Sequence, residues 1–278
     1  MVSVYSATNG YATTTSLNKN SQTQSKALGQ TASGKGITKA SDNAAGLAVA
    51  LQLSSDVSTL RQSSTNLLQG TSVLQTADGA LEQTGNILNR MKELATQANS
   101  GGVDDAGRTA INEEYQSLAQ ELGNLATQTS FNGQPLLNGS YNQDFQVGTT
   151  GTDVLSADLS SVDISLSGLG LTAGAGASAG ALLTQSSAAA TSSELDTAIA
   201  NISSYRADVG ATLSEFSTQS DVVDETITAT IEAQSAITDA DIGKASSDLA
   251  GSKLLTELSV AAAAQGNKMS ASFLKLVR

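Results

Sequence analysis

The feature that most constrains the fold is a run of regularly spaced apolar residues between positions 43 and 99. Every seventh residue is Leu or Ala, namely Leu53, Leu60, Leu67, Leu74, Leu81, Leu88 and Ala95. A weaker second row contains Val57, Ala77, Met91 and Ala98. Two such rows, offset by three or four residues, form the seam of a helix that packs on other helices. At about 1.5 Å per residue, one uninterrupted helix here would span roughly 85 Å, which predicts an elongated rod.

A second long helix with the same period is predicted in the C-terminal half. Thr191-Ser-Ser-Glu194 resembles a capping box and predicts the start of this helix. One seven-residue row contains Leu195, Ile202, Val209, Phe216, Val223 and Ile237, and a companion row contains Ile199, Leu213 and Ile227. The two long helices have matching periods and are therefore expected to pack together. Seven-residue spacing by itself also fits a purely intramolecular bundle core.

The segment between the long helices is predicted to hold a shorter helix and then β-hairpins. The helix should begin near Asp104-Asp105, and its apolar face contains Ile111, Tyr115, Leu118, Leu122 and Leu125. Asn132-Gly and Asn138-Gly are turn dipeptides, and residues 144–148 and 162–166 have the composition of short strands. Residues 172–190 are mostly Ala, Gly and Ser, which predicts a flexible surface loop.

Both ends of the chain are predicted to be interaction segments. Residues 1–33 are polar, with few large apolar residues such as Leu17 and Leu28, and two glycines at 34 and 36 predict a hinge. The final forty residues are apolar over much of a helix circumference, with Leu249, Leu254, Leu255, Leu258, Phe273, Leu274, Leu276 and Val277. Exposed apolar area on this scale marks an interaction surface.

Composition argues against several classes of function. The net charge of −12 disfavours nucleic acid as a partner, because binding phosphate requires a basic face. The chain has no His and no Cys, which removes the commonest general base, thiolate metal ligands and disulfides. No apolar run approaches the roughly 18 residues of a membrane span, and no cleaved signal sequence is evident at the N-terminus. We therefore expect a non-enzymatic protein with no catalytic residues, metal site, cofactor or membrane contact.

Three local motifs resemble ligand-binding or catalytic sequences, but each is better explained as an ordinary part of the fold. Residues 29–35 have the glycine and lysine spacing of a phosphate loop, but Gly36 stands where Ser or Thr would hold magnesium. Residues 239–243 suggest a calcium loop, but Ala250 occupies the position of the bidentate Glu. Glu113 and Glu114 are adjacent on a predicted helix, so their side chains diverge.

Many motifs in one order resemble bacterial flagellin, of a short form without large outer variable domains. At the N-terminal side these are residues 33–48, 74–82 and 88–97, followed by Gln128-Thr-Ser-Phe-Asn-Gly and Phe145-Gln-Val-Gly. At the C-terminal side they are Tyr205-Arg-Ala-Asp-Val-Gly-Ala, Ile237-Thr-Asp-Ala-Asp and the ending Phe273-Leu-Lys-Leu-Val-Arg. The chain departs from the family at Gly36, where flagellins usually have Arg, and in the residues around Ser6.

The resemblance implies a fold that is mainly α. An elongated antiparallel helical rod, coiled-coil-like, would carry a small β-hairpin region and a terminal helix pair. Residues 1–43 and 239–278 would form a terminal coiled-coil core domain, residues 44–176 and 191–238 the rod domain, and residues 177–190 a short variable loop. The rod core would contain the buried rows of the long helices together with Leu118 and Leu122.

The resemblance also implies a function and its partners. The chain would be a structural subunit that polymerises into the extracellular flagellar filament, the helical propeller for swimming. Partners would be other copies, hook–filament junction and cap proteins, and an export chaperone with the type III apparatus that secretes the subunit. Filament-core contacts would come from Leu17, Leu28 and the apolar residues between Leu249 and Val277 given above.

Arg90, Leu94 and Glu114 match positions through which many flagellins contact a host Toll-like receptor. These residues would contact either the next subunit or that receptor, whereas the alternative is that Leu94 simply packs in the rod. Two other readings of the whole chain remain open from sequence, a secreted filament or adhesin and a hook–filament junction protein.

Overall fold

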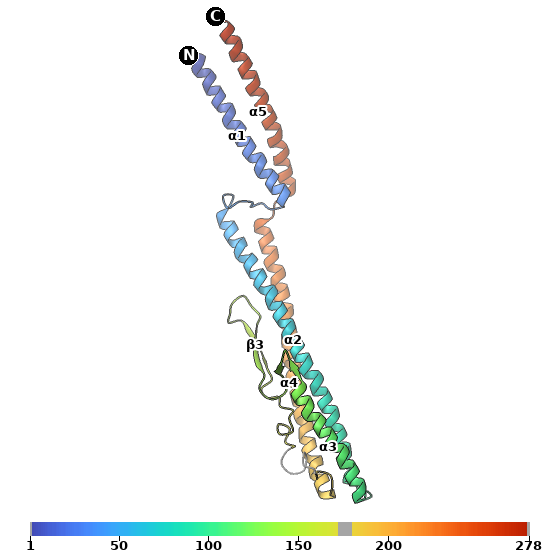
Figure 1. Cartoon of the computed structure of the whole chain (residues 1–278). Coiled ribbons are helices and arrows are strands. Elements are labelled where there is room, and N and C mark those ends of the chain that lie inside the picture. The colour runs from blue at the N-terminus through green and yellow to red at the C-terminus, as the bar shows by residue number, and fades with distance from the viewer. Residues whose placement is uncertain (1, 172–179, 277–278) are drawn as a thin grey trace. The chain divides into compact units, whose positions relative to one another are not determined.

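The described part of the chain folds into five helices and two small pairs of antiparallel strands, shown in Figure 1. The structure is a computed structural model that describes residues 2–171 and 180–276. The helices are α1 (Val2–Ser33), α2 (Ala44–Ala98), α3 (Asp105–Gln128), α4 (Gln185–Thr238) and α5 (Ile242–Leu276). The predicted fold class, mainly α with a small β region, is confirmed. The chain divides into two compact units, unit 1 (Met1–Val57 with Thr228–Arg278) and unit 2 (Ser58–Ile227).

In unit 1 the two terminal helices α1 and α5 lie side by side (Figure 1). The residues of α5 least exposed to solvent recur every three or four positions and are mostly small: Ala245, Leu249, Ser252, Thr256, Ser259 and Ala263. Opposite them α1 buries Ala27, and Asn20 Nδ2 donates a hydrogen bond of 3.3 Å to Ser259 Oγ. The seam between these helices is therefore narrow and built from small side chains.

The connections α1–α2 and α4–α5 are hydrogen-bonded to each other within unit 1. Gly34 ends α1 with a φ of 71°, and its carbonyl accepts a 2.9 Å bond from the amide of Ala240. The Gly36 amide donates to the Thr238 carbonyl at 2.6 Å, and a Cβ at position 36 would lie 3.1 Å from the Asp239 carbonyl oxygen. Gly34 and Gly36, which were predicted as a hinge, thus form a joint in which the two connections are bonded together. Glycine suits both positions, because Gly34 has a left-handed backbone conformation and Gly36 lies close to the Asp239 carbonyl.

A carboxylate organises the same joint. Asp42 Oδ2 accepts hydrogen bonds from the amides of Thr38 and Lys39, and Asp42 Oδ1 lies 3.1 Å from Lys26 Nζ on α1. The Lys26 contact, and then the backbone and hydroxyl donors, lower the pKa of Asp42 to about 2. The carboxylate therefore remains ionised, and the loop stays tied to α1, at any pH above about 4.

Unit 2 is built around the predicted apolar rows of α2 and α4. Leu60, Leu67, Leu74, Leu81 and Leu88 of α2 are all buried, as are Leu195, Ile202, Val209, Phe216 and Val223 of α4. The helices run antiparallel, since Ser64 bonds Asp224 whereas Lys92 pairs with Asp196. Helix α3 begins where predicted, with Asp104 as its N-cap accepting a 2.8 Å bond from the Gly107 amide.

The β region agrees only in part with the sequence prediction. Strands β1 (Ser130–Phe131) and β2 (Gln134–Pro135) are joined by Asn132-Gly133, both with positive φ, as the predicted turn requires. Strand β3 (Asn142–Gln146) pairs with β4 (Val154–Asp158), so the predicted strand at 162–166 is wrong. Val162 and Ile164 are instead buried in irregular backbone, because Asp163 makes only an isolated bridge with Asn138.

Helix α4 begins at Gln185, six residues before the predicted capping box. Thr191 is fully buried within the helix, and its hydroxyl donates a 3.2 Å bond to the carbonyl of Ala181. The preceding segment packs into unit 2, since Ala181 and Leu182 are buried and the Leu182 amide donates to Asn112 Oδ1 at 3.1 Å. The predicted surface loop at 172–190 is therefore wrong for residues 180–190, and residues 172–179 lie outside the described part.

Candidate assembly and partner surfaces

The predicted rod-core residues fall into the interior of the helical units with two partial exceptions. Leu53, which belongs to unit 1, and Leu118 of α3 are half-buried, whereas Leu122 is fully buried. Tyr115 of α3 is also fully buried, and burial, followed by the nearby Glu194 charge, raises the pKa of its phenol. The predicted rows thus form the interior of the folded chain.

Three of the predicted filament-core residues of α5 lie on the side of the helix away from α1. Leu254, Leu255 and Leu258 are 61%, 52% and 66% exposed, and Met269 on the same side is 54% exposed. On α1, Leu28 is 56% exposed and Leu17 is half-buried, whereas Leu249 is half-buried in the seam. Phe273, Leu274 and Leu276 fall in the last turns of α5 and Val277 lies outside the described residues.

The positions of small and large side chains in the α1–α5 pair are the reverse of those in most helix pairs. A helix pair normally buries its large apolar residues in the seam and exposes small or polar ones. Here Ser252 and Ser259 occupy the seam while their leucine neighbours face solvent. We define Leu254, Leu255, Leu258 and Met269 as the α5 apolar face. Its leucines were predicted from the sequence, but the small-residue seam was not, although the seven-residue spacing of Ala245, Ser252 and Ser259 indicates it.

Arg90 and Glu114 form an exposed ion pair between α2 and α3. Arg90 Nη2 lies 2.7 Å from Glu114 Oε1, and Arg90 Nη1 lies 2.9 Å from Glu93 Oε2. The hydrogen bonds that Arg90 donates to Glu114, more than the one it donates to Glu93, raise the pKa of Arg90. Both carboxylates hold the guanidinium in place on the surface.

Leu94, grouped with these two residues from sequence, is only 1% exposed. Its side chain lies in the core of unit 2 with Met91 and Ala95, because α2 is covered here by both α3 and α4. A second buried row is needed where two helices cover one. The prediction that Leu94 contacts a partner is therefore corrected, and the alternative of packing in the rod describes it.

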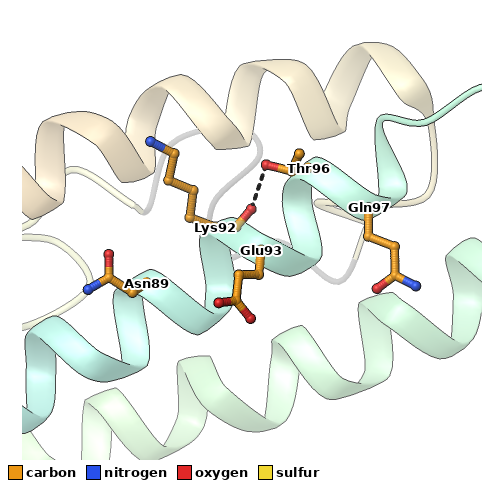
Figure 2. Close-up of a pocket in the computed structure, with 5 residues that line it drawn as sticks. All are labelled: Asn89, Lys92, Glu93, Thr96 and Gln97. Carbon is orange, nitrogen blue, oxygen red and sulfur yellow. Dashed lines mark hydrogen bonds between the residues drawn. The ribbon is translucent and has the colours of Figure 1, made fainter.

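The hollow drawn in Figure 2 lies on the same part of α2 and is open to solvent. Its lining residues are Asn89, Lys92, Glu93, Thr96 and Gln97, and Lys92 pairs with Asp196 of α4. Sites that enclose small molecules are mostly apolar and draw on several elements. Five polar residues from one helix do not meet that description.

Within the described residues, no group of three or more Asp and Glu is placed to hold a metal ion. Over the same residues, no helix is both long and apolar enough to cross a bilayer.

Comparison with known proteins identifies the family. Residues 4–142 match the model of the bacterial flagellin N-terminal helical region, and residues 183–277 match that of the bacterial flagellin C-terminal helical region. The flagellin of Listeria innocua serovar 6a is 34% identical over 262 residues, which cover 91% of each chain. The chain belongs to the bacterial flagellin family. It is a structural subunit that polymerises into the flagellar filament, and therefore a protein of motility.

Other flagellins match most of the chain or about half of it. The flagellin of Halalkalibacterium halodurans is 30% identical over 254 residues, again 91% of each chain. The phase 1 flagellin of Salmonella naestved is 35% identical over 157 residues, 56% of this chain but 31% of that protein. A crystal structure of Bacillus cereus flagellin covers 57% of this chain and 88% of its own, at 27% identity and a TM-score of 0.49. With 278 residues, this flagellin is of the short form.

Proposed function

We propose that the α5 apolar face drives polymerisation by packing against other copies of the chain in the filament core. The observation that carries this proposal is the inverted packing of the terminal helices, in which small residues fill the α1–α5 seam and leucines face outward. Burying one fully exposed Leu contributes about 1.5–3 kcal/mol, so burying several half-exposed side chains supplies several kcal/mol per subunit. Residues 1–43 and 239–278 would then form the filament core, as the sequence predicted.

Replacing Leu254 and Leu258 with Ser is expected to raise the concentration needed for polymerisation by about 100-fold, because roughly 3 kcal/mol of apolar burial is lost. Both side chains are more than 60% exposed in the subunit, so its own fold should be unchanged. Seeded polymerisation followed by ultracentrifugation and negative-stain microscopy measures the effect. Deleting residues 254–278 should likewise leave a soluble monomer.

Leu183→Ser serves as the matched control, since Leu183 is 41% exposed and lies in unit 2. This variant should polymerise like the unmodified chain. Sedimenting filaments of normal length from the Leu254/Leu258 variant, or from the truncated chain, would exclude the α5 apolar face as the driving surface.

The remaining partners follow from the same assembly. Subunits would be secreted unfolded through the type III apparatus with an export chaperone, and the filament would meet junction proteins at its base and cap proteins at its tip. The α5 apolar face needs a cover before assembly, because exposed apolar surface of this size promotes aggregation. A chaperone that binds α5 would provide that cover.

Arg90 and Glu114 would contact either the neighbouring subunit or a host Toll-like receptor through their exposed polar atoms. Arg is frequent at binding hot spots, and here its guanidinium is held in place by two carboxylates. A reporter-cell assay with monomeric chain should give a signal that Arg90→Ala reduces about tenfold, the effect of losing one charged hydrogen bond. No signal from the unmodified monomer would remove the receptor from the proposal.

A further inference from the structure

Arg61 and Leu68 form an exposed patch on α2, which we call the α2 patch. Each directly follows a residue of the buried row, Leu60 and Leu67, so the two side chains lie on one face of the helix. Leu68 is 68% exposed, more than any other large apolar residue described in unit 2. An apolar side chain two turns from a cation makes a surface that another molecule can cover.

Arg61 also differs in its ion pairing from the other basic residues of unit 2. Unit 2 contains 5 Lys and Arg against 19 Asp and Glu, which gives it a net charge of −14. Arg90, Lys92, Arg108 and Arg206 each pair with a carboxylate of the same unit. No such pair is found for Arg61 within the described residues, so its charge is available to another molecule.

An acidic stripe on α4 has the complementary properties. It consists of Asp208, Glu215 and Glu225 together with Val222, all of them exposed, and Val222 is 49% exposed. Asp208, Glu215 and Val222 are spaced by seven, and each directly precedes a buried residue, namely Val209, Phe216 or Val223. No ion pair involves these three carboxylates among the residues that the structure describes.

The α2 patch and the acidic stripe project to opposite faces of the α2–α4 pair. The helices are right-handed and antiparallel, so residues that follow the buried row on α2 share a face with residues that follow it on α4. Contacts within the chain agree, since Glu82 and Ser64 on the patch side of α2 contact Arg206 and Asp224 of α4. Residues that precede the α4 row, as the acidic stripe does, therefore point the other way.

We propose that the α2 patch of one subunit packs against the acidic stripe of a second copy of this chain. Two complementary surfaces on opposite faces make a heterologous contact, which repeats in one direction instead of closing into a dimer. Arg61 would offset the repulsion between two units of charge −14, while Leu68 and Val222 would be covered together. The contact rests on the proposed function, because it presupposes that copies assemble, and it adds a contact between unit 2 surfaces to those of the α5 apolar face.

A charge-reversal series tests the contact directly. Arg61→Glu should raise the concentration required for seeded polymerisation by about three- to tenfold, since it places a like charge against the stripe. Adding a second reversal within the stripe, Arg61→Glu with Glu215→Arg, should restore polymerisation because every interface then carries the swapped pair. The same double variant is made with Asp208→Arg and with Glu225→Arg, so that whichever carboxylate faces Arg61 is found.

Arg61→Glu with Glu121→Arg is the matched control, since Glu121 is an exposed acid on α3 outside the stripe and the net charge is the same. This variant should polymerise no better than Arg61→Glu alone. Normal polymerisation of Arg61→Glu, or equal rescue by the Glu121 control, would overturn the contact. Failure of the unmodified chain to polymerise, or indifference to the α5 substitutions, would instead count against the proposed function. Unchanged helical circular dichroism and thermal melting in each variant exclude misfolding as the cause.

Discussion

Phe216→Ala is expected to lower the free energy of unfolding of unit 2 by about 3–5 kcal/mol, the typical cost of removing a buried Phe. Phe216 is fully buried and joins three elements. It lies on α4, contacts Gly70 of α2, and meets the Phe145 ring of β3 edge-on at 5.6 Å between centroids. Removing the ring therefore leaves a cavity that neither helix can close by itself.

Urea denaturation of the full chain, followed by circular dichroism, measures this loss. Val222→Ala is a matched control on the same helix, because Val222 is 49% exposed and its truncation should change stability by no more than about 0.5 kcal/mol. The β3–β4 pair should loosen in the Phe216 variant, which amide exchange at Phe145 and its neighbours would reveal. A loss no larger than that of the control would mean that the ring does not join these elements.

Gly70→Ala is expected to destabilise unit 2 by about 1–3 kcal/mol through overpacking. A Cβ at position 70 would lie 2.2 Å from Cε1 of Phe216, far inside van der Waals contact. Replacing Gly by Ala within a helix normally stabilises it by up to about 1 kcal/mol, so the sign of the change shows whether the ring can move. The Phe145 ring packs edge-on against Phe216 and restricts its movement, and we therefore expect the clash to prevail.

Gly79→Ala is the matched control for Gly70→Ala. It lies on the same helix, and a Cβ there would meet no atom within 4 Å, so this substitution should stabilise the chain by about 0.5–1 kcal/mol. Gly70→Ala combined with Phe216→Ala should cost less than the sum of the two single changes, since the shortened side chain leaves room for the new methyl group. Additive losses would show that Gly70 and Phe216 are not coupled.

Local signals predicted those parts of the fold that depend on local geometry. The seven-residue rows identified the long helices and their buried faces, because a helix exposes one stripe of its sequence to each neighbour. Asn132-Gly133 and Gly34 were recognised as turns, since few other residues adopt a positive φ. Asp104 was correctly placed at the start of α3 for the same kind of local reason.

Predictions that depended on the neighbour of a segment were less successful. Residues 162–166 have the composition of a strand, but β3 pairs with Val154–Asp158 and not with them. Thr191 resembles a helix cap in the sequence, but it lies inside α4. Its hydroxyl donates a hydrogen bond to the carbonyl of Ala181, which precedes the helix. Leu94 was grouped from sequence with the exposed Arg90 and Glu114, but its side chain is buried because α3 and α4 both cover that turn of α2.

The sequence by itself determined that this chain is a helical flagellin with an apolar C-terminal helix. Period, turn chemistry and the ordered motifs are properties of the chain alone. Only the tertiary structure decided which apolar residues remain exposed, because burial depends on what lies opposite each side chain. It is the small-residue seam of α1 and α5 that leaves Leu254 and Leu258 in solvent, and the antiparallel packing of α2 on α4 that sends Arg61 and Glu215 to opposite faces.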